Sequence, residues 1–149
     1  MFKKILVPID GSEQSYRALN FAMDLAKKYS AKVTLINVAQ PNVIIPVYST
    51  QPTLAPIPTI TFDENIENTH KKILSNAFDE AKKIDSEIKI SKRLINGRPA
   101  DKIIDVAKED GFDLIVIGSR GLGGLKEFLL GSVSNRVADH AHCPVLIVK

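Results

Sequence analysis

The chain alternates short apolar, β-branched runs with segments of helical period, and this alternation limits its fold more than any other feature. The apolar runs span residues 5–9, 32–38, 88–95, 113–117 and 145–148. Several of them are apolar throughout rather than on every second residue, which is typical of strands buried on both faces. Strands that alternate with helices form a parallel sheet through right-handed crossovers. We therefore expect an α/β fold with one open, five-stranded parallel sheet in the order 3-2-1-4-5 and helices on both faces.

Four amphipathic segments between these runs are predicted helices. Ser12 and Ser132 are good N-caps for the first and fourth, the second spans about 63–84, and Pro99 suits the first turn of the third, after which Gly111 follows. The predicted inward-facing residues are Ala18, Ala22, Leu25, Ala26 and Tyr29; Ile66, Ile73, Ala77, Ala81 and Ile84; Ala100, Ile103, Ile104 and Ala107; and Val133, Val137, Ala138 and Ala141.

Length and composition indicate one ordinary domain, residues 1–149, without a membrane segment. The single cysteine, Cys143, cannot form an internal disulfide and is interpreted as a small buried hydrophobe, so we expect a reducing, cytoplasmic location. No apolar run approaches the ~18 residues that a membrane span needs. The net charge of +3 arises from intermixed acidic and basic residues. This pattern is typical of a solvated surface, so we do not expect nucleic-acid binding.

The segment at about 40–62 does not follow the alternation. It holds five of the eight prolines, so neither a helix nor a central strand can persist through it. Connections of this length are generally lids, interaction loops or mobile insertions. Its apolar residues include Val43, Ile44, Ile45, Val47, Leu54 and Ile57. Part of this proline-rich loop is therefore expected to pack on the domain, on a ligand or on another subunit.

Glycines cluster where the fourth predicted strand leads into the fourth helix. Five of the eight glycines lie between Gly118 and Gly131, and Ser132 follows them. Glycine permits positive φ and close approach of a ligand to the backbone, and a helix N-terminus attracts anions. In a sheet of this order the segment lies beside 8–12, which follows the first strand, at the edge where α/β proteins bind ligands. The sequence therefore predicts a phosphate site there.

Two better-known phosphate motifs are absent. No G-x-x-x-x-G-K-[ST] occurs, and Lys126 occupies the position where G-x-G-x-x-G requires its third glycine. These departures disfavour a P-loop NTPase and a dinucleotide-dependent dehydrogenase.

Three segments together resemble the universal stress protein family. They are Lys4-Ile-Leu-Val-Pro-Ile-Asp-Gly-Ser12, Asp113-Leu-Ile-Val-Ile-Gly-Ser-Arg-Gly121, and the stretch from Gly131-Ser132 to Cys143-Pro-Val-Leu-Ile-Val148. The similarity covers the chain apart from residues 40–62, which vary within that family. The complete G-x2-G-x9-G-[ST] spacing resembles its ATP-binding branch. The resemblance implies a Rossmann-like domain, similar to adenine nucleotide alpha hydrolases, and a nucleotide-dependent stress-response role.

The resemblance also implies which residues hold the phosphates of ATP, or of AMP or ADP. They are Gly118, Gly121, Gly131 and Ser132. The donors would be backbone amides and the Ser132 hydroxyl. From position we add Arg120, whose guanidinium lies within the loop, and Ser134, in the first turn of the fourth helix, with Val133 between it and Ser132. As alternatives, the glycines serve a tight turn, Ser132 is only a cap, and Arg120 is solvated.

The nucleoside is assigned to the ends of the first and second predicted strands. The resemblance implies that Asp10 faces the ribose or a phosphate-bound Mg²⁺, that Pro8 and Ile9 border the nucleoside, and that the Val38 backbone meets adenine. The neighbourhood of Gly97 is expected to line the same site. As an alternative, Asp10 only caps the first helix together with Ser12.

Catalysis is not the first expectation. His140 and His142 are two residues apart, so they face different sides of a helix and do not suit a shared metal, and His70 lies on the second helix. No general base is evident beside the glycines, so any ATP hydrolysis would depend on Mg²⁺ and be slow. The leading prediction is an ATP-binding regulator that is a homodimer through its apolar C-terminal strand. The alternatives are a nucleotide-independent interaction module that docks through residues 40–62, and a slow ATPase.

Overall fold

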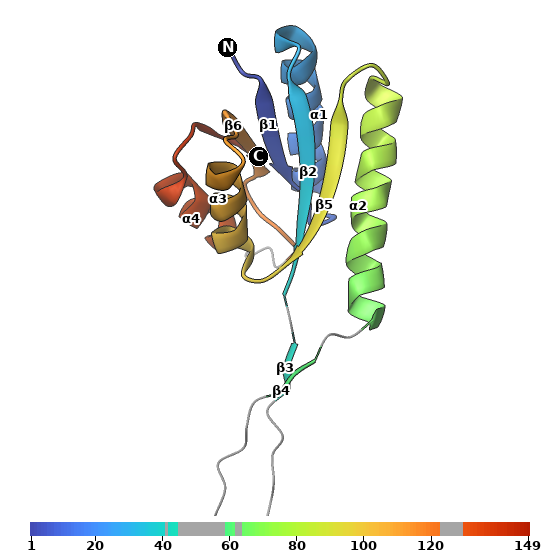
Figure 1. The fold of residues 1–149 in the computed structure, drawn as a ribbon, viewed down its shortest axis with the longest axis vertical. Coiled ribbons are helices and arrows are strands. Elements are labelled where there is room, and N and C mark those ends of the chain that lie inside the picture. Colours follow the sequence, from blue (N-terminus) through green and yellow to red (C-terminus); the bar gives the residue numbers. More distant parts are fainter. Residues whose placement is uncertain (41, 45–58, 62–63, 123–129) are drawn as a thin grey trace, which may run out of the picture.

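The computed structural model describes residues 1–40, 42–44, 59–61, 64–122 and 130–149. Five parallel strands form one sheet in the order β5-β2-β1-β6-β7 (Figure 1). Its strands are β1 (Lys4–Pro8), β2 (Lys32–Ala39), β5 (Ile90–Asn96), β6 (Leu114–Gly118) and β7 (Val145–Val148). Numbered along the chain, these five strands follow the order 3-2-1-4-5, so the predicted topology is confirmed.

Four helices connect the strands of this sheet and cover both of its faces. They are α1 (Glu13–Tyr29), α2 (Glu64–Ile84), α3 (Pro99–Glu109) and α4 (Ser132–His140). Buried residues of α1 and α2 share one hydrophobic cluster, and those of α3 and α4 share another on the opposite face. Ser12 caps α1 as predicted, because its Oγ accepts the Ser15 N–H at 3.2 Å. Pro99 begins α3, also as predicted.

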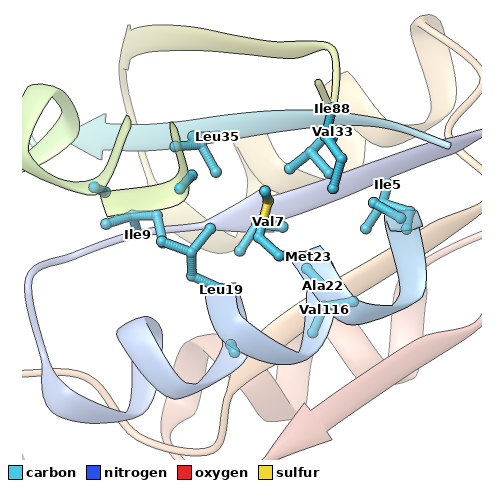
Figure 2. Packing of buried hydrophobic residues seen from close by; sticks show 14 of the residues in the cluster. Ile5, Val7, Ile9, Leu19, Ala22, Met23, Val33, Leu35, Ile88 and Val116 are labelled. Atoms are coloured by element: carbon cyan, nitrogen blue, oxygen red, sulfur yellow. The ribbon is translucent and has the colours of Figure 1, made fainter. Parts of the chain in front are cut away.

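The larger cluster lies between the sheet and the helices α1 and α2. Ile5, Val7 and Val33 point from the strands toward Leu19 and Met23 of α1, as Figure 2 shows. All five side chains are buried, at 1% exposure or less. This packing holds α1 against β1, and it therefore also positions the turn that joins them.

The helical stripes differ from prediction at their ends. Ile84 is the last residue of α2 and is 43% exposed, and Ala138 on α4 is exposed, so both were wrongly assigned to the core. Leu74 and Val106 are buried although they were not predicted. The other predicted inward residues are buried or half-buried.

Two short strands lie within the proline-rich loop, near its two ends. β3 (Asn42–Ile44) and β4 (Thr59–Thr61) pair as an antiparallel ribbon apart from the five-stranded sheet (Figure 1). The prediction of no central strand is therefore compatible with them. The loop's five prolines lie outside the described residues.

The sheet register determines where a ligand could meet the backbone. β1 ends at Pro8, which pairs with Ile36, whereas β2 continues three residues further, to Ala39. On the other side of β1, β6 ends at Gly118. We call the region formed by these strand ends, with residues 9–12, 118–122 and 130–132, the carboxyl edge. Within the described part of the chain, no helix is long and apolar enough to cross a membrane.

Candidate functional site

The β1–β2 ladder stops short of Val38 and leaves a polar strand edge. Its last bond is donated by the Ile9 N–H to the Ile36 carbonyl, at 2.8 Å. In a parallel ladder, the N–H and C=O of alternate residues point to the same neighbour. The N–H and C=O of Val38 therefore point in the same direction as those of Ile36, toward β1. At this position, however, β1 has already ended. Val38 thus presents one donor and one acceptor at the carboxyl edge.

Pro8 and Ile9 lie on the β1 side of this region, with the Ile9 side chain in the core cluster of α1 and α2. Both are buried, with Ile9 only 2% exposed. Val38 is half-buried. The structure therefore brings together the three residues that were predicted to meet the nucleoside, at the ends of two neighbouring strands.

Asp10 connects the two loops of the carboxyl edge. Its Oδ1 accepts the Ser12 N–H at 2.9 Å and the Ser12 hydroxyl at 2.5 Å, while its Oδ2 accepts the Leu122 N–H at 3.2 Å. Asp10 therefore does more than accompany Ser12 at the start of α1, because it also holds the turn after β6.

The chemistry of Asp10 limits how a metal could bind. A carboxylate has about four acceptor positions, and three are used here. The described residues contain no group of three or more His, Cys, Asp or Glu side chains that could hold a metal ion. Mg²⁺ commonly takes only one or two protein carboxylates and completes its octahedron with phosphates and waters. The residues present fit Mg²⁺ only as part of a nucleotide complex.

The three glycines of the predicted motif are needed for close approach rather than for positive φ. None of these three has a positive φ, so they do not use glycine's conformational freedom. Gly123 and Gly124 of the same cluster lie outside the described residues. A Cβ on Gly118 would lie 2.8 Å from the Gln14 carbonyl carbon of α1, and a Cβ on Gly121 would lie 2.4 Å from Asp10 Oδ2. A Cβ on Gly131 would lie 3.3 Å from the Ser119 carbonyl oxygen. Packing against the α1 backbone therefore accounts for Gly118, whereas a Cβ on Gly121 would meet a side-chain end and one on Gly131 would need a smaller shift.

The N-terminus of α4 differs from prediction by one residue. Gly131, with extended φ/ψ of −61° and 155°, is the N-cap, and Ser132 is the first helical residue, so Ser132 is not the cap. No side chain caps this helix, whereas Ser12 caps α1. The first-turn N–H groups of α4, in Ser132 and half-buried Val133, therefore have no side-chain partner from the cap. Such a helix end suits an anion.

Ser134 forms hydrogen bonds within the protein at this helix start. It is 2% exposed, and its Oγ lies 2.8 Å from the Ser119 carbonyl oxygen and 2.9 Å from that of Gly131. The Gly131 N–H also donates to the Ser119 carbonyl, at 2.7 Å. Ser119 thus joins the end of β6 to the start of α4, a role that the sequence analysis did not anticipate.

Two other residues, Arg120 and Gly97, were also predicted to line the site. Arg120 is exposed, and its guanidinium has no hydrogen bond or ion pair with a described residue. The Gly97 N–H donates to the Ala39 carbonyl at 2.9 Å, which places the end of β5 next to the end of β2.

Asn37 and His70 were not predicted as site residues. Asn37 Nδ2 donates to the Ile9 carbonyl at 2.7 Å, and its Oδ1 is 2.7 Å from His70 Nδ1 on α2. Asn37 is 2% exposed. The available signal was an amide side chain, Asn37, in the apolar second half of a strand run.

Groups outside the carboxyl edge offer little chemistry. A cavity of about 160 Å³ lies at the opposite, amino end of the sheet, lined by Lys4, Lys32, Thr34, Lys89, Ile90, Ser91 and Phe112. Burial raises the pKa of the half-buried Cys143 thiol, which disfavours a reactive thiolate. Burial, with a smaller effect of the Glu80 charge, also raises the pKa of Tyr16.

Comparison with known proteins identifies the family. The model of the universal stress protein family matches residues 1–149. Universal stress protein YxiE of Bacillus subtilis is 40% identical over 152 residues, covering 100% of both chains. A universal stress protein of Methanocaldococcus jannaschii is 36% identical, covering 100% of this chain and 83% of the relative. A solved universal stress protein in complex with cAMP is 27% identical, with a TM-score of 0.72, covering 99% of this chain and 97% of the other. The chain belongs to the universal stress protein family.

Proposed function

We propose that this protein binds an adenine nucleotide at the carboxyl edge and acts as a nucleotide-dependent regulator or adaptor in the cytoplasm. The observation that carries the proposal is the unpaired Val38 backbone, which lies on the same edge of the sheet as the uncapped N-terminus of α4. Its family membership and a relative solved with cAMP support the same class of ligand.

The base would pair with Val38. Adenine carries an acceptor, N1, next to a donor, its 6-amino group, and a strand edge offers the complementary N–H and C=O. Pro8 and Ile9 would border the base on the β1 side. Backbone pairing of this kind would favour adenine over hypoxanthine, in which the donor and acceptor are exchanged.

The phosphates would take the N–H groups at the start of α4 and in the turn after β6. The first-turn amides of Ser132 and Val133, with the exposed Ser132 side chain, are donors at this edge that no cap side chain occupies. Asp10 now accepts the Leu122 N–H, so a polyanion would compete with its carboxylate for this turn. Mg²⁺ bound with ATP would neutralise charge between Asp10 and the phosphates. We therefore infer Mg·ATP as the ligand, with ADP or AMP as weaker ones.

The experiment combines native mass spectrometry with calorimetry. Adenine nucleotide should dissociate when the purified protein is heated, and Mg·ATP should bind more tightly than Mg·ITP. Val38→Pro removes the N–H that points away from β5, and an edge position of a strand tolerates proline. Val38→Ala keeps this N–H and is the matched control. Loss of binding in Val38→Pro alone is expected; equal binding by both variants, or no binding by the unmodified protein, contradicts the proposal.

We further propose that the protein is a homodimer through β7. This strand is at the edge of the sheet, and Leu146 on it is 37% exposed. An uncovered apolar edge strand promotes association, and pairing with a twofold mate covers it. Light scattering at micromolar concentration should give twice the chain mass of 16.4 kDa.

A further inference from the structure

Both ends of the Asn37 amide are hydrogen-bonded although the side chain is buried. Its Nδ2 is 2.7 Å from the Ile9 carbonyl oxygen, and its Oδ1 is 2.7 Å from His70 Nδ1. A carbonyl oxygen can only accept, so the amide nitrogen must face Ile9. The amide oxygen must then accept from His70, which requires a hydrogen on His70 Nδ1. The two ends of the amide thus have one defined partner each. The nitrogen is bonded to Ile9, which follows β1, and the oxygen to His70 on α2.

These contacts explain why the β1–β2 ladder ends where it does. After the bond from the Ile9 N–H to the Ile36 carbonyl, the next bond of a regular parallel ladder would run from the Val38 N–H to the Ile9 carbonyl. The register instead stops at Pro8 paired with Ile36. The Ile9 carbonyl instead accepts from the side chain of Asn37, one residue before Val38, and no hydrogen bond runs from the Val38 N–H to it. The Val38 N–H therefore loses its regular partner.

We propose that Asn37 is a positioning residue for the nucleotide, because it removes the Ile9 carbonyl from the ladder and leaves the Val38 N–H available to the base. His70 holds the amide in this orientation from the second turn of α2. This inference rests on the proposed function, since it deepens the role of Val38 in reading the base. It also links α2 to the site without direct contact between the helix and the ligand.

The first test is made without ligand, by measuring amide hydrogen exchange by NMR. In the unmodified protein, Val38 should exchange about tenfold or more faster than Ile36, whose N–H belongs to the regular ladder. Asn37→Leu frees the Ile9 carbonyl, so Val38 should gain protection while the protein loses stability. Leu74→Ala is the matched control, because Leu74 is a buried core residue of α2 and its truncation lowers stability without removing a hydrogen bond of Asn37. Protection of Val38 in the unmodified protein, or its absence in Asn37→Leu, overturns the inference.

The second test keeps the buried position intact. His70 is half-buried, so His70→Ala should fold. The His70→Ala variant should show slower amide exchange at Val38 and weaker adenine nucleotide binding. In His70→Gln, the amide can still donate to Asn37 Oδ1, so exchange and binding should match those of the unmodified protein. If the unmodified protein binds nucleotide and His70→Ala binds equally well with fast exchange at Val38, the positioning role fails and the proposed function stands. If no nucleotide binds to the unmodified protein, the proposed function fails, and exchange at Val38 still decides what Asn37 does.

Discussion

Replacing Gly118 with alanine separates a packing role of this glycine from a ligand-binding role. The new Cβ would lie 2.8 Å from the Gln14 carbonyl carbon and 2.9 Å from its oxygen, where ordinary contacts begin at 3.4 Å. Both atoms belong to the backbone of α1, so the helix itself must move away from β6. Overpacking of this kind typically destabilises a protein by about 1–3 kcal/mol. For a domain of this size, that loss lowers the unfolding temperature by roughly 2–12 °C.

The measurement is thermal and urea unfolding of the ligand-free protein, followed by circular dichroism. Gly121→Ala is the matched control, because its Cβ would meet Asp10 Oδ2, a side-chain end that can shift at the cost of its bond from the Leu122 N–H, rather than a helix backbone. This control should change the free energy of unfolding by less than about 1 kcal/mol. If Gly118→Ala unfolds together with the unmodified protein but loses nucleotide affinity, Gly118 serves the ligand and the packing argument is refuted.

Four further predictions concern stability and assembly. Leu19→Ala, at a fully buried position, should lower the free energy of unfolding by about 2–5 kcal/mol in urea titrations; a change under 1 kcal/mol would contradict the core assignment. Ser134→Ala should cost about 1 kcal/mol and weaken nucleotide binding, because the Ser119 carbonyl loses the hydroxyl at the start of α4; unchanged binding would show that the link is dispensable. Hydrogen bonds from the Lys3 and Lys4 backbone lower the pKa of Asp113 below its ordinary 3.8, so its stabilising contribution is present above that pH and is lost as pH falls through the lowered value. Asp113→Asn should therefore have a lower unfolding temperature than the unmodified protein at pH 7, and the two should converge at acid pH; a constant difference would contradict this. Leu146→Lys should give a monomer in light scattering if β7 forms the dimer, and an unchanged mass would exclude that interface.

The topology could be predicted because each strand and helix carries its own local signal. The run at 114–117 is apolar at every position and is buried on both faces in the structure. Ser12 and Pro99 mark helix starts with chemistry that is complete within a few residues. Ile84 was assigned wrongly because periodicity continues to the last turn of α2, whereas burial there depends on what lies opposite. Helix stripes thus predict which face is buried better than where burial ends.

The site was predictable in its location but less so in its contacts. Ser132 looks like a cap by residue type, yet Gly131 takes the extended conformation and the helix begins one residue earlier than expected. Gly118 belongs to the glycine pattern, but its need for a missing side chain comes from Gln14, more than a hundred residues away in sequence. Such a need for glycine depends on a contact between residues that are distant in sequence. A single sequence does not show which distant residues are in contact.

At the carboxyl edge, some backbone groups have no hydrogen-bond partner among the described residues, although a different side chain at positions 37 or 131 could have supplied a partner or left one available. Asn37 takes the carbonyl that Val38 would use, and glycine at position 131 leaves the first turn of α4 without a side-chain cap. Serine or aspartate at that cap would be worth about 0.5–2 kcal/mol relative to a residue that cannot cap, and a regular ladder bond about 1 kcal/mol. Both open positions lie at one edge of the sheet, where α3 also starts without a side-chain cap. The described buried side-chain polar atoms, by contrast, are all hydrogen-bonded. A ligand that offers a donor, an acceptor and a phosphate to this edge would complete both sets of bonds, which is the physical reason to expect a nucleotide there.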